Sequence, residues 1–256
     1  MAQTTLSGKV ALVTGGGRGI GRAVALALGR AGAALALTAR TRAQLDAVAA
    51  ELKDAGAAAI VICEMDVADP DALAAGLERI RAALPRIDIL VNNAGIAESA
   101  SIARTDLTLW ERHLAVNATA PFQLSRALLP GMVERRWGRI INMASLAGLG
   151  GAPYIAAYAA SKHALVGLTR ALAAETAGTG VTVNAVCPGF VASEMTWRAA
   201  KRISEKTGQL FAHAMGALAR FNTSGQLIQP EQVAEIVLEL TGDAAGGRTG
   251  ETVVIS

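Results

Sequence analysis

Two tyrosines and a lysine in the stretch GAPYIAAYAASKHA, residues 151–164, have types and spacing that could move a proton. Tyr154 and Tyr158 are the only tyrosines in the chain, and Lys162 follows Tyr158 by four residues. Residues four apart on a helix are neighbours, so the lysine ammonium would lie one turn from the phenol. At roughly 6 Å and an effective dielectric of about 20, the ammonium favours the phenolate by about 3 kcal/mol. This lowers a phenol pKa of about 10 to about 8, which predicts that Tyr158 is a general acid or base.

Tyr154 lacks such a partner, because Tyr158 itself occupies the position four residues downstream. Two interpretations of Tyr154 stay open from the residues alone. It lines the pocket of a substrate, or it is an ordinary packing residue. The neighbouring cation therefore selects Tyr158 as the reactive phenol.

A glycine-rich turn near the N-terminus could hold a phosphate. The stretch VTGGGRGIGRAV, residues 13–24, follows a strand-like run and opens a helical one. Gly15, Gly19 and Gly21 give the spacing TGxxxGxG, and Ile20 stands where the usual third glycine would fall. Glycines allow close backbone approach, and the helix N-terminus offers free N–H groups and a partial positive charge. The context predicts a dinucleotide pyrophosphate site.

The end of the second strand indicates which dinucleotide is bound. An NAD enzyme places a carboxylate there for the ribose 2′-hydroxyl, but this strand ends LTARTR, with Ala39, Arg40 and Arg42. Arg18 lies in the glycine loop as well. A guanidinium binds a 2′-phosphate in a bidentate way. The sequence therefore predicts NADP(H), with NAD(H) as the alternative.

Short aliphatic runs alternate with helical patterns along the chain, and this alternation positions the motifs. Most of the runs are apolar on both faces, which is typical of a parallel sheet covered by helices on each side. The pattern predicts an α/β, Rossmann-type, doubly wound, seven-stranded and mostly parallel sheet, in one domain over residues 1–256. The expected strands are 9–14, 33–38, 58–63, 87–92, 138–145, 181–186 and 251–256, and the expected helices are 19–31, 42–55, 70–84, 107–135, 153–178 and 230–241.

Residues 193–228 depart from the alternation, because they are long and have no strand of their own. They follow the sixth strand, and ligands of open α/β sheets bind beyond the carboxyl ends of strands. A structural cap and a substrate-covering lid both fit. We favour the lid because so long an insertion in a compact domain is often functional.

Composition excludes several other classes of protein. The chain is 52% hydrophobic and 18% charged, with a net charge of +3 and no long basic block, so nucleic-acid binding is not expected. Cys63 and Cys187 lie far apart, and the three histidines lack ligand spacing, so no metal site is expected. We read no signal peptide and no membrane-spanning run, which predicts a cytoplasmic protein that does not engage the membrane.

In combination the motifs resemble the short-chain dehydrogenase/reductase family, in its single-domain branch. The resemblance runs from Lys9 to about Thr252. The motifs that carry it are TGGGRGIG (14–21), DV (66–67), NNAG (92–95), Asn117, Ser145, YAASK (158–162) and PG (188–189).

The resemblance implies roles for these residues. The catalytic set would be Asn117, Ser145, Tyr158 and Lys162, with Tyr158 as proton donor, Ser145 as hydrogen-bond donor to the same substrate oxygen, and Asn117 holding a water that feeds protons to Lys162. Lys162 would also bind the nicotinamide ribose. The remaining cofactor contacts would come from Gly15, Arg18, Gly19, Ile20, Gly21, Arg40, Asp66, Val67, Asn93, Ala94, Gly95, Pro188, Gly189, Val191 and Ser193.

The patterns MVERRWGRIINMAS and TGVTVNAVCPGFVASEM resemble reductases of 3-oxoacyl thioesters and aromatic polyketide ketoreductases. The expected reaction is NADPH-dependent reduction of a 3-oxoacyl thioester of acyl carrier protein or coenzyme A, or of a related ketone. Alternatives are oxidation of a secondary alcohol or hydroxyacyl-CoA, and a non-catalytic dinucleotide-binding regulator. Apolar residues spread over more than one face of 161–176 predict a homotetramer or homodimer.

Overall fold

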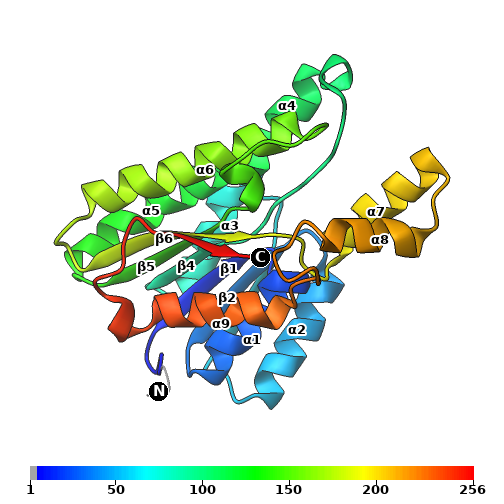
Figure 1. Ribbon diagram of the computed structural model, residues 1–256. Helices are drawn as coiled ribbons and strands as arrows, with labels where there is room; N and C mark the ends of the chain where they lie inside the picture. The colour runs from blue at the N-terminus through cyan, green and yellow to red at the C-terminus, as the bar shows by residue number, and fades with distance from the viewer. Residues whose placement is uncertain (1–4) are drawn as a thin grey trace.

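The computed structural model describes residues 5–256 and contains one seven-stranded sheet, seen at the centre of Figure 1. The strand order is β3-β2-β1-β4-β5-β6-β7, and every neighbouring pair is parallel. The expected doubly wound architecture is confirmed, with strand ends displaced by one or two residues. The strands are β1 Val10–Thr14, β2 Ala34–Ala39, β3 Ile60–Glu64, β4 Ile89–Asn92, β5 Gly138–Met143, β6 Val181–Pro188 and β7 Thr252–Ile255.

Helices cover both faces of the sheet (Figure 1). One face carries α1 Gly19–Arg30, α2 Arg42–Asp54 and α9 Pro230–Thr241, and the other carries α3 Pro70–Ala83, α4 Leu107–Leu114, α5 Ala120–Glu134 and α6 Ala156–Glu175. No helix within residues 5–256 combines the length and the apolar character that crossing a membrane requires.

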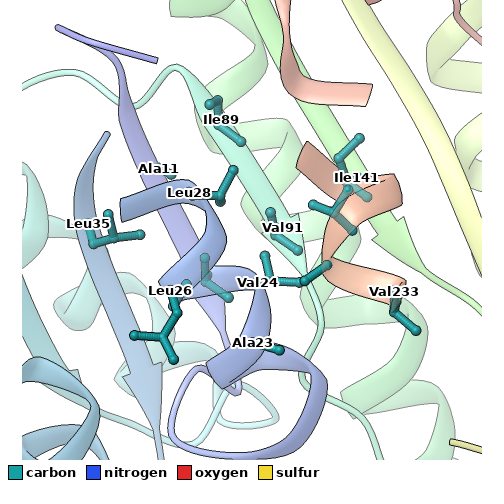
Figure 2. Packing of buried hydrophobic residues seen from close by; sticks show 14 of the residues in the cluster. Ala11, Ala23, Val24, Leu26, Leu28, Leu35, Ile89, Val91, Ile141 and Val233 are labelled. Carbon is teal, nitrogen blue, oxygen red and sulfur yellow. The ribbon is translucent and has the colours of Figure 1, made fainter. Parts of the chain in front are cut away.

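Two apolar clusters fix the helices against the sheet. Under α1 and α9, Val24 and Val233 pack with Val91 and Ile141 from the central strands (Figure 2). A second cluster joins α3 and α5 to the opposite face of the same strands. Burying one such aliphatic side chain contributes roughly 1.5–3 kcal/mol, so these two layers hold the strand ends in a fixed arrangement.

The expected helix 107–135 is wrong in one respect, because a π-helical turn at Ala115–Thr119 separates α4 from α5. Pro121 lies two residues after this turn and has no N–H. In a regular α-helix that N–H would bond to the carbonyl of Asn117, four residues earlier. The proline therefore prevents a regular helical ladder at a residue that the sequence marked for function.

The expected helix 153–178 begins later than predicted, at Ala156, and ends at Glu175. Tyr154 has a φ of +68°, in the left-handed region that a non-glycine residue adopts rarely. Its carbonyl accepts a hydrogen bond from the Ala100 N–H at 2.8 Å, which ties the start of α6 to the loop after β4. Helical backbone therefore cannot include this position.

Residues 193–228 form two helices, α7 Glu194–Thr207 and α8 Phe211–Ala219, which project from the body at the right of Figure 1. They pack on one another through a small cluster of their own around Ala200, Ala214 and Leu218. A bridge between Val191 and Ile228 joins the two ends of the segment. As expected, no regular strand lies within it.

Candidate active site

Many of the predicted site residues lie near the carboxyl ends of β1, β4, β5 and β6, whereas Arg40 and Asp66 follow β2 and β3. The sheet order changes direction between β1 and β4, since β2 and β3 lie on one side of β1 and β4 to β7 on the other. Such a switch point opens a crevice outside the strand ends in parallel sheets. Gly15 follows β1, Asn93 follows β4 and Gly189 follows β6.

The conformation of the glycine loop requires glycine at two positions. Gly15 has a φ of +64°, and a Cβ on Gly21 would lie 2.2 Å from the Gly15 carbonyl oxygen and 2.5 Å from Asn93 Nδ2. Arg18 precedes α1 as its N-cap but forms no side-chain capping bond, whereas α3 is capped by Asp69. The first N–H groups of α1 thus have no side-chain acceptor, which fits an anionic group at this helix end.

Thr14 and Asn93 clamp the glycine loop to the end of β4. The Thr14 hydroxyl accepts hydrogen bonds from the Asn93 and Ala94 N–H groups, each at 3.0 Å. Asn93 Nδ2 donates in turn to the Thr14 carbonyl at 2.8 Å and to the Gly15 carbonyl at 3.2 Å. Asn93 therefore supports the phosphate loop directly. Thr14 stands within the TGGGRGIG motif, yet it was not among the expected site residues.

The residues expected at the adenine end also lie together. Arg40 Nη1 is 3.9 Å from Asp66 Oδ2, and Asp66 Oδ1 accepts the Ala68 N–H at 3.0 Å. Val67 beside them is buried. Burial lowers the pKa of Arg18, and the nearby cations Arg198 and Arg40 lower it further.

Arg18 also pairs with Glu194 at the start of α7. The Cβ of Ser193, the residue before Glu194, would lie 3.9 Å from a Cβ on Gly19. The base of the α7–α8 hairpin therefore lies against the glycine loop, and Val191 anchors it through the bridge to Ile228.

The turn after β6 depends on a residue that the sequence did not indicate. The Asn222 side chain accepts from the Phe190 N–H and donates to the Phe190 carbonyl, both at 2.8 Å. A Cβ on Gly189 would lie 2.1 Å from Asn222 Oδ1, so only glycine fits beneath this amide. Asn222 lies 32 residues further along the chain than Phe190, within the irregular segment after α8, and no local pattern pointed to it.

Tyr158 and Lys162 are neighbours on α6, as their spacing predicted. Lys162 Nζ lies 5.9 Å from the centre of the Tyr158 ring, and it donates to the Met143 carbonyl at 2.6 Å. Lys162 is 4% exposed, and Tyr158 is partly buried. The ammonium is thus held between the end of β5 and the phenol.

The predicted pKa of about 8 for Tyr158 is wrong for the cofactor-free protein. Burial raises the pKa of the Tyr158 phenol, and a hydrogen bond with Ser145 offsets only part of this. Burial also lowers the pKa of Lys162, from 10.5 to about 8. The spacing of the two residues indicates the attraction between their charges but not the loss of hydration that both suffer on burial. Near neutral pH the phenol therefore holds its proton firmly.

Ser145 lies between β5 and the short helix Leu146–Gly148, with an extended backbone. Its Oγ accepts the Ala147 N–H at 3.1 Å, which fixes the side-chain rotamer. Ser145 also lies close enough to Tyr158 to lower the pKa of its phenol in part.

Asn117 occupies the π-helical turn and is fully buried. Its Oδ1 accepts the Ile96 N–H and its Nδ2 donates to the Ile96 carbonyl, both at 3.0 Å. Nδ2 also donates to Ser161 Oγ, which donates to the Tyr158 carbonyl. The amide therefore joins the loop after β4 to α6. A Cβ on Gly95 would lie 3.2 Å from Asn117 Oδ1 and 3.6 Å from Lys162 Nζ, which places all three groups together.

His113 is another residue beside the site that the sequence did not assign to it. It is fully buried, with its ring edge-on to Tyr158 at 6.3 Å between centroids. Nε2 accepts the Glu98 N–H at 3.1 Å, so the proton of the neutral ring lies on Nδ1, which bonds the Leu109 carbonyl at 2.8 Å. His113 thus accepts a hydrogen bond from the loop after β4 and packs its ring against the Tyr158 phenol.

Protonation of Lys162 predicts how stability changes with pH. The unfolded chain keeps this proton up to a pKa of about 10.4, whereas the folded chain loses it near 8. The unfolded state therefore binds more protons between these values, and the free energy of unfolding rises with pH, by about 2–3 kcal/mol from pH 8 to 10. Urea unfolding at several pH values measures this rise. In Lys162→Met the contribution is absent, so an equal rise in that variant contradicts the shift.

Comparison with known proteins identifies the family. A family model described as short chain dehydrogenase matches residues 9–204. The 3-oxoacyl-(acyl-carrier-protein) reductase FabG of Pseudomonas aeruginosa is 39% identical over 252 residues, which cover 98% of this chain and 97% of the relative. The 2-(S)-hydroxypropyl-CoM dehydrogenase 3 of Xanthobacter autotrophicus is 40% identical over 253 residues, 98% of this chain and 96% of the relative.

A crystal structure of a variant of the actinorhodin polyketide ketoreductase with NADPH superposes with a TM-score of 0.91 at 35% identity. The match covers 96% of this chain and 95% of that one. The fold of this chain is therefore shared over nearly its full length with that ketoreductase. This chain belongs to the short-chain dehydrogenase family.

Proposed function

We propose that the chain is an NADPH-dependent reductase of ketones, with 3-oxoacyl thioesters as its substrate class. The observation that carries the proposal is the position of the Tyr158 phenol beside the Lys162 ammonium, whose Nζ lies 5.9 Å from the ring centre. Burial raises the pKa of this phenol. Reduction of a ketone needs a proton at the carbonyl oxygen, and a phenol with a raised pKa is present in the donor form.

The residues of the chain have distinct parts in this chemistry. NADPH, when bound, would supply the hydride that reduces the carbonyl carbon. Tyr158 gives its proton to the oxygen as negative charge develops there, and Ser145 donates a hydrogen bond to that same oxygen. The ammonium of Lys162 then stabilises the phenolate that remains.

Lys162 and Asn117 support Tyr158 as the proton donor. The Lys162 ammonium is positioned by the Met143 carbonyl, and it would also hold the nicotinamide ribose. We assign Asn117 to the proton supply of Lys162, since the π-helical turn disrupts the regular backbone bonding at this residue next to Gly95 and Lys162.

The choice of NADP(H) over NAD(H) rests on the convergence of Arg18 and Arg40. Arg40 lies close enough to Arg18 to lower the pKa of the Arg18 guanidinium. Two adjacent cations suit a dianionic 2′-phosphate. Arg40→Asp is expected to weaken NADPH binding at least tenfold while NADH binding is maintained or improved. Fluorescence titration with both cofactors measures this. Arg42→Asp is the control, because Arg42 is not among the cations that lower the pKa of Arg18. Equal loss in both variants contradicts the assignment.

A substrate panel tests the reaction itself. Oxidation of NADPH is followed by absorbance with acetoacetyl-CoA, a cyclic ketone and a keto sugar, and each reaction is repeated with NADH. The proposal expects the thioester to have the highest kcat/KM. Turnover of the keto sugar alone would remove 3-oxoacyl thioesters as the substrate class.

Oxidation of a secondary alcohol is the second candidate, favoured by the 40% identity to a 2-(S)-hydroxypropyl-CoM dehydrogenase. The same residues would run the proton transfer in reverse, with Tyr158 as base. The two directions are distinguished by kcat/KM with 3-hydroxybutyryl-CoA and NADP⁺ against acetoacetyl-CoA and NADPH at pH 7.

We also assign a lid role to residues 193–228 and a homo-oligomeric state to the protein. The hairpin starts beside the glycine loop and carries exposed Met195, Trp197 and Phe211. On the far side of the sheet, Leu107, Trp110 and Phe122 of α4 and α5 are exposed as well, which suits contact with a second copy. Sedimentation velocity measures the assembly, and a purely monomeric protein at micromolar concentration contradicts it.

A further inference from the structure

We propose that Arg202 forms an oxyanion-binding subsite at the mouth of the active site, which takes a carboxylate or phosphate of the substrate. The inference rests on the proposed function, because it defines the substrate class of that same site. The subsite lies where α7 meets the loop after β4.

Arg202 lies on α7 and reaches across to the loop after β4. Its Nη1 donates to the Ser99 carbonyl at 3.2 Å and approaches Ser99 Oγ at 3.5 Å. The side chain is partly buried, unlike the exposed Lys201 beside it. Arg202 therefore points back toward the body of the molecule.

The charge of Arg202 has no acidic partner. Within residues 5–256, no Asp or Glu forms an ion pair with it, whereas the neighbouring cations Arg198 and Lys201 pair with Glu194 and Glu205. Even the carboxylate of Glu98, which precedes Ser99, is directed elsewhere, to Arg112 at 2.9 Å. The Arg202 guanidinium is therefore a cation that no described carboxylate neutralises, which leaves it available to an anionic ligand.

The two chain neighbours of Ser99 contact residues that lie near the reactive phenol. The N–H of Glu98 bonds to His113, whose ring packs against Tyr158. The N–H of Ala100 bonds to the carbonyl of Tyr154, which is four residues before Tyr158. Adjacent Cα atoms lie only about 3.8 Å apart, so Ser99 and the guanidinium that it holds belong to the rim of the same site.

The chemistry of the guanidinium defines the ligand. Arginine presents five N–H donors in a planar fork, and only Nη1 has a partner among the described residues. The N–H groups of Arg202 that have no such partner match the two oxygens of a carboxylate or the oxygens of a phosphate. For a 3-oxoacyl thioester, that group is a carboxylate on the acyl chain or the phosphate of the pantetheine arm.

Three thioesters distinguish the two sources. The N-acetylcysteamine thioester of acetoacetate is neutral, that of 3-oxoadipate adds an acyl carboxylate, and acetoacetyl-CoA adds phosphates. In Arg202→Gln we expect KM to rise about tenfold or more for one of the two anionic substrates, with kcat and the NADPH dissociation constant unchanged. KM for the neutral thioester stays the same. The anionic substrate that is affected identifies the source.

Two control variants separate binding from structural support. Lys201→Gln removes a neighbouring charge that is already paired and should change no KM. Arg202→Lys keeps the charge but loses the fork, so it should restore part of the affinity for the anionic substrate. An equal rise in KM for all three thioesters, or no rise for any, overturns the inference.

A binding measurement tests the Arg202 subsite without turnover. With saturating NADP⁺, calorimetry compares adipate and CoA as probes of the carboxylate and the phosphate. We expect the parent chain to bind one of them and Arg202→Gln to bind it about tenfold more weakly. Failure of the parent chain to bind either probe overturns the subsite. Failure to oxidise NADPH with all three thioesters instead overturns the proposed function.

Discussion

Tyr158→Phe is expected to lose turnover by a factor of about 10²–10⁴ and to bind NADPH as the parent chain does. The substitution removes only the hydroxyl that donates the proton, and the ring still packs against His113 and Lys162. The folded structure and the glycine loop are therefore unchanged. Steady-state NADPH oxidation gives kcat, and fluorescence titration gives the dissociation constant of the cofactor.

The other tyrosine of the chain is the matched control for this experiment. Tyr154 is 66% exposed and contacts the loop after β4 through its backbone carbonyl rather than its hydroxyl. Tyr154→Phe is therefore expected to keep kcat within a few-fold of the parent value. A parent-like kcat in Tyr158→Phe, or an equal loss in Tyr154→Phe, contradicts the assignment of the proton donor.

Gly21→Ala is expected to weaken NADPH binding about 100-fold and to destabilise the fold by roughly 1–3 kcal/mol. The added Cβ would lie 2.2 Å from the Gly15 carbonyl oxygen and 2.5 Å from Asn93 Nδ2, so the phosphate loop must move away from β4. Losing one or two hydrogen bonds to a charged phosphate, at about 1.5–3 kcal/mol each, accounts for the affinity change. Titration with NADPH and urea unfolding measure the two effects.

Gly247→Ala is the control for the glycine substitution. No atom lies within 4 Å of the position of its added Cβ, and its φ is not in the left-handed region. This variant should keep both the affinity and the free energy of unfolding. If Gly21→Ala behaves in the same way, the close approach of the loop to Asn93 does not determine cofactor binding.

The sheet was predictable because its strands are short aliphatic runs that leave few alternatives. Seven strands in parallel register follow from runs such as VALVT and from the helices between them. The breaks in helices were harder to foresee. The π-helical turn at 115–119 and the late start of α6 depend on Pro121 and on the backbone of Tyr154, which is tied to Ala100 from a distant loop.

Local motifs identified the charged and reactive side chains of the site, but not the residues that position those side chains. The glycine loop and the Tyr158–Lys162 spacing are contiguous patterns, and the structure brings both to the switch point of the sheet. Asn222 and His113 act through contacts between segments that are far apart in sequence or through burial. A single sequence carries no signal for such contacts.

The buried amides near the site are also contacts that a single sequence does not indicate. Asn92 donates to Asn142 at 2.8 Å, and Asn142 donates to Thr169 on α6 at 2.9 Å. The three side chains link β4 and β5 to the helix that carries Tyr158 and Lys162. In the sequence they stand as isolated polar residues in apolar runs, because only the assembled sheet makes them partners.

The pKa values required the structure because burial, rather than the nearest charge, determines them. Spacing alone favours a phenolate, whereas the folded environment raises the pKa of Tyr158 and lowers that of Lys162 to about 8. The assignment of Tyr158 as the reactive phenol remains a prediction, but its reason changes. It acts as a donor that keeps its proton until a neighbouring oxygen becomes basic.

The protonation state of Tyr158 is the measurement that tests this account most directly. Since the chain has two tyrosines, Tyr154→Phe leaves Tyr158 as the only phenol, and its titration can be followed by ultraviolet absorbance of the phenolate. In the cofactor-free protein we predict that the phenolate appears only above pH 10, because burial raises this pKa. A phenolate already formed at pH 8 would contradict the account of Tyr158 as a protonated donor.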